Sequence, residues 1–167
     1  MLRERFITLM LVVVLAWPMS AVALDVGDPA PPFEGQTTAG DRIVSAEMKG
    51  KGALFLVFWA TWCPVCKTEI PKLKEIHETY AAKGMPLIAI DVGVNDSLKK
   101  VEKYLEDHKI TYPVIFDEGS KITKLYGIQG TPTVVIVDKG GIVRYRSAAI
   151  PDDLKDHFPA LMKEPGS

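Results

Sequence analysis

A continuous apolar run, residues 53–58, is followed closely by two cysteines, Cys63 and Cys66. An unbroken apolar run of this length is typical of a strand that is buried on both faces. A helix is expected next, because Ile70, Leu73, His77 and Tyr80 recur at three- and four-residue steps. The two cysteines are therefore expected where a buried strand ends and a helix begins.

The rest of the chain alternates between further strands and helices. Strands are expected at residues 85–92, 112–116, 133–138 and 142–147, and helices at residues 95–108, 120–126 and 152–162. Lys139-Gly140-Gly141 is a turn that joins the last two strands as an antiparallel hairpin. Residues 25–51 are rich in Pro and Gly and predict a leading β extension beside the main sheet. These elements predict an α/β fold with a central mixed sheet, which has a parallel core and an antiparallel hairpin and is flanked by helices.

The amino terminus has the pattern of an export signal. Arg3 and Arg5 precede an almost unbroken apolar run at residues 6–19, and Ala21-Val22-Ala23 matches the A-x-A cleavage pattern. We expect a signal peptide over residues 1–23 and one domain over residues 24–167. The alternative is an uncleaved membrane anchor, because residues 6–24 come near the length that spans a bilayer. Both alternatives place the domain outside the cytoplasm, in the periplasm or an equivalent compartment, with membrane contact only if the segment is retained.

The spacing of Cys63 and Cys66 favours redox chemistry. Cysteines three residues apart at a helix start can bring their sulfurs within bonding distance. The partial positive charge and free N–H groups of the helix terminus favour a thiolate and lower the pKa of the first cysteine. We expect an exposed Cys63 to attack a partner disulfide and a more buried Cys66 to resolve the mixed disulfide. Pro64 suits the first helical position, where its missing N–H costs nothing.

A structural disulfide and a zinc site are the two other uses of such a cysteine pair, and the sequence favours neither. A structural disulfide closing so short a loop adds little stability, because the gain in chain entropy grows with loop length. A zinc site normally needs four ligands, and the three histidines do not have ligand spacing around the cysteines. The formal net charge of -1 gives no indication of nucleic-acid binding. No G-x-G-x-x-G motif follows a strand, so no nucleotide cofactor is expected. The lack of zinc ligands beyond the two cysteines means that no metal is expected either.

Several motifs together resemble the thioredoxin superfamily. Trp62-Cys63-Pro64-Val65-Cys66 follows the expected buried strand, and Gly130-Thr131-Pro132-Thr133 precedes a later one. The resemblance narrows to the TlpA/ResA/CcmG group of extracytoplasmic thiol–disulfide oxidoreductases, on segments 27–33, 58–63 and 66–71. It extends from Val26 to Arg146 and implies a thioredoxin fold.

The resemblance also implies roles for individual residues. Pro132 should follow a cis peptide bond and face the cysteines, and the backbone of Thr131 should pair with an extended partner peptide. Trp62 and Pro64 should contact the partner as well. Glu69, three residues after Cys66, should exchange protons with the thiols, although an exposed glutamate is the common alternative. Thioredoxin has a buried Asp at the position of Val57, so this chain lacks the usual proton acceptor.

The leading functional hypothesis is a reductase of exported protein disulfides, for example in apocytochrome c, which receives electrons from a membrane thiol donor. We expect a monomer. The alternatives are a disulfide oxidant or isomerase, a peroxidase of the peroxiredoxin kind, and a non-catalytic binding module. The peroxidase motif P-x-x-x-T-x-x-C fails, because Ala60 stands where Thr is required.

Overall fold

The computed structural model describes residues 24–163, so the expected signal peptide and the last four residues lie outside the described part. The strands are β1 (Glu34–Gln36), β2 (Arg42–Val44), β3 (Leu54–Trp59), β4 (Leu87–Asp91), β5 (Val114–Phe116), β6 (Thr133–Val137) and β7 (Val143–Ser147). The α-helices are α1 (Pro64–Tyr80), α2 (Leu98–Asp107), α3 (Lys121–Leu125) and α4 (Leu154–Leu161). Two short 3-10 helices are η1 (Ser45–Met48) and η2 (Ala81–Lys83).

The central sheet has five strands in the order β5-β4-β3-β6-β7. Strands β3, β4 and β5 are parallel, whereas β6 runs antiparallel to both β3 and β7. The expected mixed sheet, with its parallel core and antiparallel hairpin, is therefore confirmed. All six residues of β3 are buried, as the apolar run predicts for the middle strand of a covered sheet.

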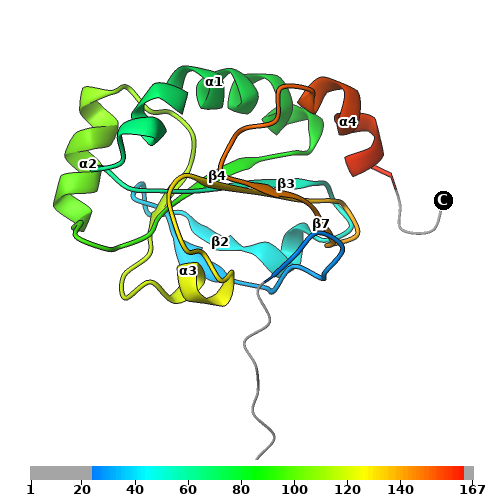
Figure 1. The fold of residues 1–167 in the computed structure, drawn as a ribbon, viewed down its shortest axis with the longest axis horizontal. Helices are drawn as coiled ribbons and strands as arrows, with labels where there is room; N and C mark the ends of the chain where they lie inside the picture. The colour runs from blue at the N-terminus through cyan, green and yellow to red at the C-terminus, as the bar shows by residue number, and fades with distance from the viewer. Residues whose placement is uncertain (1–23, 164–167) are drawn as a thin grey trace, which may run out of the picture.

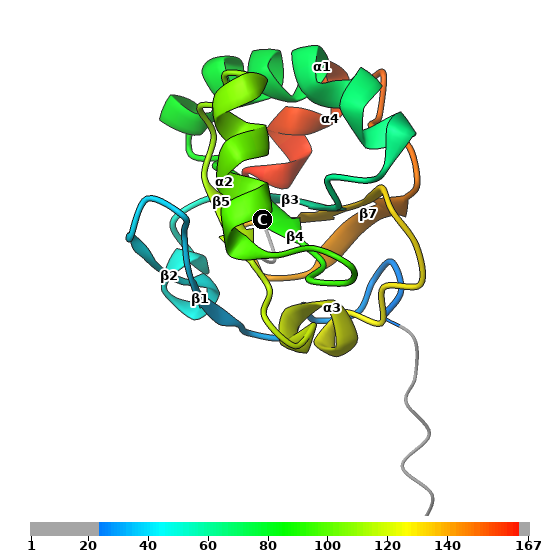
Figure 2. The same ribbon diagram turned by 90° about the vertical axis from the view of Figure 1, so that its left-hand side faces the viewer.

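Helices cover both faces of this sheet. Helices α1 and α4 lie on one face and α3 lies on the other, together with the β1–β2 hairpin (Figure 1). Figure 2 shows α2 on the same side as α1, next to β5, the last strand of the sheet. Within residues 24–163, no helix has the length and apolar character needed to cross a bilayer.

The leading β extension forms a two-stranded antiparallel sheet of its own, β1–β2. Its preceding segment is tied to the core through Tyr126, whose hydroxyl donates a hydrogen bond to the Pro31 carbonyl at 2.9 Å. The ring of Phe33 packs edge-on against Tyr126, with 5.9 Å between ring centroids. These contacts close the face of the sheet opposite α1.

The second long helix begins later than the sequence pattern predicts. Helix α2 starts at Leu98, with the Ser97 hydroxyl accepting a hydrogen bond from the Lys100 N–H, and not at residue 95. Asn95 has a positive φ of 54°, which a helix interior does not allow. The side chain of Asp96 instead bonds Thr61 in the loop after β3, so residues 93–97 form a tight loop. The expectation of helix over 95–97 was wrong for this reason.

Gly93, directly after β4, is where this loop turns. Its φ is 68°, and a Cβ placed there would lie 2.2 Å from the carbonyl oxygen of Asp117. The close approach involves backbone, which cannot move aside as a flexible side chain can. Gly40 also has a positive φ, of 95°, but a Cβ there would meet nothing within 4 Å.

We expect Gly93→Ala to lower the free energy of unfolding by more than about 1 kcal/mol, and by more than Gly40→Ala, because only the first adds a backbone clash to the unfavourable φ. Urea unfolding of the two variants and the parent measures both losses. Equal losses at the two glycines would show that the approach to Asp117 is not a constraint on the fold.

Candidate active site

The two cysteines form a disulfide at the junction of β3 and α1. Their sulfurs are 2.07 Å apart and their Cα atoms 5.3 Å apart. Cys63 is the N-cap residue of α1, and its Sγ accepts a hydrogen bond from the Cys66 backbone N–H at 3.1 Å. Pro64 occupies the first turn of the helix, as expected. The sulfur of Cys63 therefore faces the positive end of the helix, where a thiolate is stabilised.

The two cysteines do not differ in burial as the sequence reasoning expected. Cys63 is 3% exposed and Cys66 is 5% exposed. The expectation that Cys63 is exposed and Cys66 more deeply buried is therefore wrong for the disulfide form. The N-cap geometry explains the difference, because the Cys63 side chain turns back over the helix end toward Cys66. The adjacent Pro64 and Val65 are exposed and mark where a partner can approach.

The expected cis peptide bond is present between Thr131 and Pro132. Pro132 is buried and shares a small cavity with Cys66, whereas Thr131 is half-buried in the loop before β6. Two segments separated by more than sixty residues of sequence therefore meet at the disulfide.

This small cavity, of about 10 Å³, also brings Glu69 to the cysteine pair. Glu69 is half-buried on α1 and lines the cavity beside Cys66. Val57 forms part of the same wall, so the position that carries an acid in thioredoxin is apolar here and Glu69 is the carboxyl group lining the space. A space of this size is close to that of a single water molecule.

The two tryptophans near the disulfide have different surroundings. Trp62 is 47% exposed, and its indole N–H donates a hydrogen bond to the Val94 carbonyl at 2.7 Å. Trp59 is buried in the core and packs against the ring of Tyr104, with 5.3 Å between centroids. Trp62 is thus available to a partner, whereas Trp59 has a packing role.

Two acidic residues near this site were missed by the sequence reasoning. Asp91 ends β4 and is fully buried; burial, followed by the charge of Asp96, raises its pKa to about 7. The Asp96 carboxylate accepts hydrogen bonds from the backbone N–H and the hydroxyl of Thr61, at 2.9 and 2.5 Å. The sequence did contain a signal for Asp91, because an aspartate at the end of an apolar strand stands where an unpaired charge is rare.

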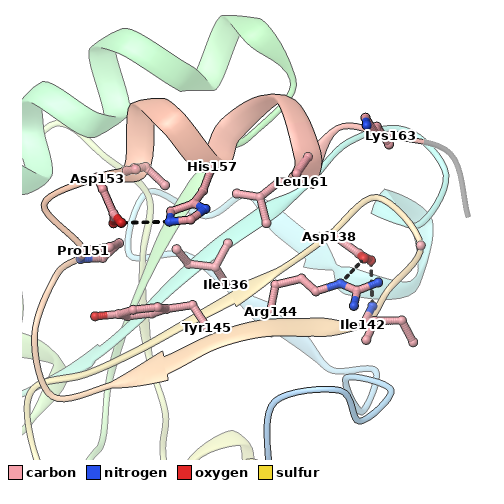
Figure 3. A pocket seen from close by; sticks show the side chains of 13 residues that line it. Ile136, Asp138, Ile142, Arg144, Tyr145, Pro151, Asp153, His157, Leu161 and Lys163 are labelled. Carbon is pink, nitrogen blue, oxygen red and sulfur yellow. Dashed lines mark hydrogen bonds and ion pairs between the residues drawn. The ribbon is translucent and has the colours of Figure 1, made fainter.

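A larger groove lies away from the disulfide, between α4 and strands β6 and β7 (Figure 3). Its volume is about 590 Å³, and four of its polar residues form ion pairs, Asp138 with Arg144 and Asp153 with His157. Neither cysteine lines it. Across residues 24–163, no group of three or more His, Cys, Asp or Glu side chains is arranged to hold a metal ion.

Comparison with known proteins gives consistent results. The family model described as AhpC/TSA matches residues 26–146. The thiol-disulfide oxidoreductase ResA of Bacillus thuringiensis is 36% identical over 120 residues, covering 72% of this chain and 68% of the relative. ResA of Geobacillus thermodenitrificans is 31% identical over 141 residues, covering 83% and 79%.

Similarity to solved structures extends over the whole described domain. The crystal structure of a thiol:disulfide interchange protein of the thioredoxin family from Chlorobium tepidum superposes with a TM-score of 0.64 at 31% sequence identity. The superposition covers 82% of this chain and 94% of that chain. These findings confirm the resemblance to the ResA group and the thioredoxin fold. The chain therefore belongs to the AhpC/TSA family, and within it is a thiol–disulfide oxidoreductase of the ResA kind.

Proposed function

We propose that this protein is an extracytoplasmic reductase that returns selected exported protein disulfides to dithiols. The observation that carries the proposal is the Cys63–Cys66 disulfide at the amino end of α1, with the Cys63 sulfur accepting the Cys66 N–H. The ResA name of relatives at 31–36% identity supports it. The export signal expected at residues 1–23 supports a location outside the cytoplasm.

The reaction starts from the reduced pair. The Cys63 thiolate attacks one sulfur of the partner disulfide, forms a mixed disulfide and releases the other partner sulfur as a thiolate. The Cys66 thiolate then attacks the Cys63 sulfur, which closes the Cys63–Cys66 disulfide and releases the second partner thiol. Two electrons pass to the partner, and a dithiol donor must reduce the new disulfide before the next turnover.

Apocytochrome c fits the substrate class, because its haem-attachment cysteines must be thiols before ligation. A membrane thiol transporter fits the donor, since the pair can be regenerated by the same exchange in reverse. Trp62 and Pro64 flank Cys63 in the sequence, and Pro132 lines a cavity with Cys66. These three residues and Thr131 are proposed to contact the partner. The half-buried Thr131 backbone is proposed to pair with an extended segment beside the partner cysteine.

Glu69 is proposed to carry protons for Cys66. Both residues line the same cavity, and resolution of a mixed disulfide requires the Cys66 thiol to lose its proton. A carboxylate at this position also opposes formation of a nearby thiolate by like-charge repulsion.

Substitution of each cysteine should separate the two roles. We expect Cys63→Ala to abolish reduction of insulin disulfides, because the attacking sulfur is lost, and Cys66→Ser to accumulate mixed disulfides with partners through Cys63. Non-reducing gels of both variants after expression in an exporting cell measure the adducts. Full insulin reduction by Cys63→Ala, or adducts through neither variant, would contradict the assigned roles.

The reduction potential should distinguish a reductase from an oxidant or isomerase. We expect a potential below about -220 mV, at or below the poise of glutathione, from equilibration of the Cys63–Cys66 pair with defined thiol buffers. A value near about -120 mV would instead assign the protein to disulfide formation.

Glu69→Gln should lower the thiol pKa values by roughly 0.5 to 1 unit, because a negative neighbour is removed. Thiolate absorbance during a pH titration of the reduced protein measures the change. Glu75→Gln is the matched control, since Glu75 is an exposed glutamate on the same helix. Unchanged titration in Glu69→Gln, or an equal change in the control, would exclude a specific effect of Glu69.

A further inference from the structure

The loop after β4 holds both residues that immediately precede Cys63. Asp96 accepts two hydrogen bonds from Thr61, one from its backbone N–H and one from its hydroxyl. The Val94 carbonyl accepts the indole N–H of Trp62. The path of the chain into the N-cap of α1 is therefore set by a loop that lies more than thirty residues away in sequence.

Asp96 makes these contacts from a buried position. Its side chain is 0% exposed, and the Lys100 ammonium lies 2.9 Å from its Oδ1. Burial raises its pKa, but the hydrogen bonds from Thr61 and Lys100 outweigh burial, so the net pKa is lowered. Asp96 is thus an anion held by three donors.

Asp91 lies next to Asp96 and has an unpaired oxygen. Its Oδ1 accepts the Gly93 N–H at 2.9 Å, whereas its buried Oδ2 has no partner among the described residues. Asp96 is the acidic side chain that acts on Asp91, both through its charge and as a side-chain hydrogen-bond partner. Two carboxyl groups can hydrogen-bond only if one carries a proton, and a proton on Asp91 would give the Oδ2 its missing partner.

The other ionisable groups around Asp91 do not replace this proton. Lys100 of α2 forms its ion pair with Asp96, and its charge lowers the pKa of Asp91 less than burial raises it. Asp117, after β5, directs its carboxylate to the N–H groups at the start of α3. Tyr104 of α2 packs on Trp59. Asp96 is therefore the acceptor that faces Asp91.

We propose that Asp91 and Asp96 form a proton-sharing carboxyl pair whose function is to position Thr61, and through it the Cys63 sulfur at the end of α1. Both are positioning residues, since neither touches the sulfurs. That this positioning affects disulfide exchange rests on the proposed function. The shared proton and its effect on Cys63 do not depend on that function.

The pair makes the site sensitive to pH near neutrality. The pKa of Asp91 is raised to about 7 by burial first and then by Asp96, so the folded protein keeps a proton that the unfolded chain releases near pH 4. The contribution of this residue to folding stability is therefore highest at low pH, falls between about pH 4 and 7, and stays low above that. Above about pH 7 two buried anions repel each other and the hold on Thr61 weakens.

The test uses the full-length protein and three matched substitutions. Asp91→Asn keeps a donor toward Asp96 without a titrating proton, and Asp96→Asn removes the charge that holds Thr61. Asp107→Asn is the control, because it removes an exposed aspartate paired with Lys103 on the same helix, α2. The readouts are carboxyl ¹³C NMR titration and the pH midpoint of Cys63 alkylation in the reduced protein.

We expect one carboxyl of the parent to titrate near pH 7 and to vanish in Asp91→Asn. In Asp96→Asn the midpoint of Cys63 alkylation should rise by about half a unit, since a displaced sulfur loses part of its stabilisation by the helix end. Asp107→Asn should keep the parent midpoint, and Asp91→Asn, which has no proton to lose above pH 7, should not raise it.

The outcomes are separable. If no carboxyl titrates above about pH 6, the shared proton is refuted. If one does, but the Cys63 midpoint is the same in Asp96→Asn, the pair does not position Cys63. Should Asp96→Asn not fold, Thr61→Val removes only the hydroxyl contact and should shift the midpoint in the same direction; no shift then overturns the proposal. Absence of disulfide reductase activity with both readouts as expected would count against the proposed function alone.

Discussion

Strand β3 is buried along its whole length and hydrogen-bonded on both sides, to β4 and to β6. Its direction and depth are therefore fixed by two ladders and by side-chain packing on both faces. Because the chain leaves this strand only four residues before Cys63, the amino end of α1 begins at a defined place above the sheet. The disulfide, the cis Pro132 loop and the loop after β4 all meet there because β3 lies between β4 and β6.

Three carboxyl groups lie around this point, and each is in a different environment. Glu69 is half-buried and lines a cavity with Cys66. Asp96 is an anion held by Thr61 and Lys100, and Asp91 is the buried acid that faces it. The apolar Val57 means that none of these groups sits where thioredoxin has its acid. The carboxyl groups near the disulfide are thus distributed over the end of β4, the loop that follows it and helix α1.

Much of this arrangement could be predicted from local patterns. The apolar run of β3, the cysteine spacing, Pro64 and the Thr131-Pro132 motif each depend on residues close in sequence, and the structure agrees with the elements they predict. The start of α2 was misplaced because Asn95 and Asp96 are compatible with a helix locally, whereas contacts to Thr61 hold them in a loop. The burial of Cys63 was missed because it depends on the direction in which the N-cap side chain turns.

The fold class, the redox cysteine pair and the family resemblance could all be predicted from short segments, because hydrophobic periodicity, cysteine spacing and turn residues are local properties. Which distant groups share an environment became clear only from the folded chain: Cys66 lies with Glu69 and Pro132, and Thr61 is bonded to Asp96, which acts on Asp91. The reason is physical. Burial, charge and hydrogen bonding between segments depend on distances set by sheet order and register, and no local pattern encodes those distances.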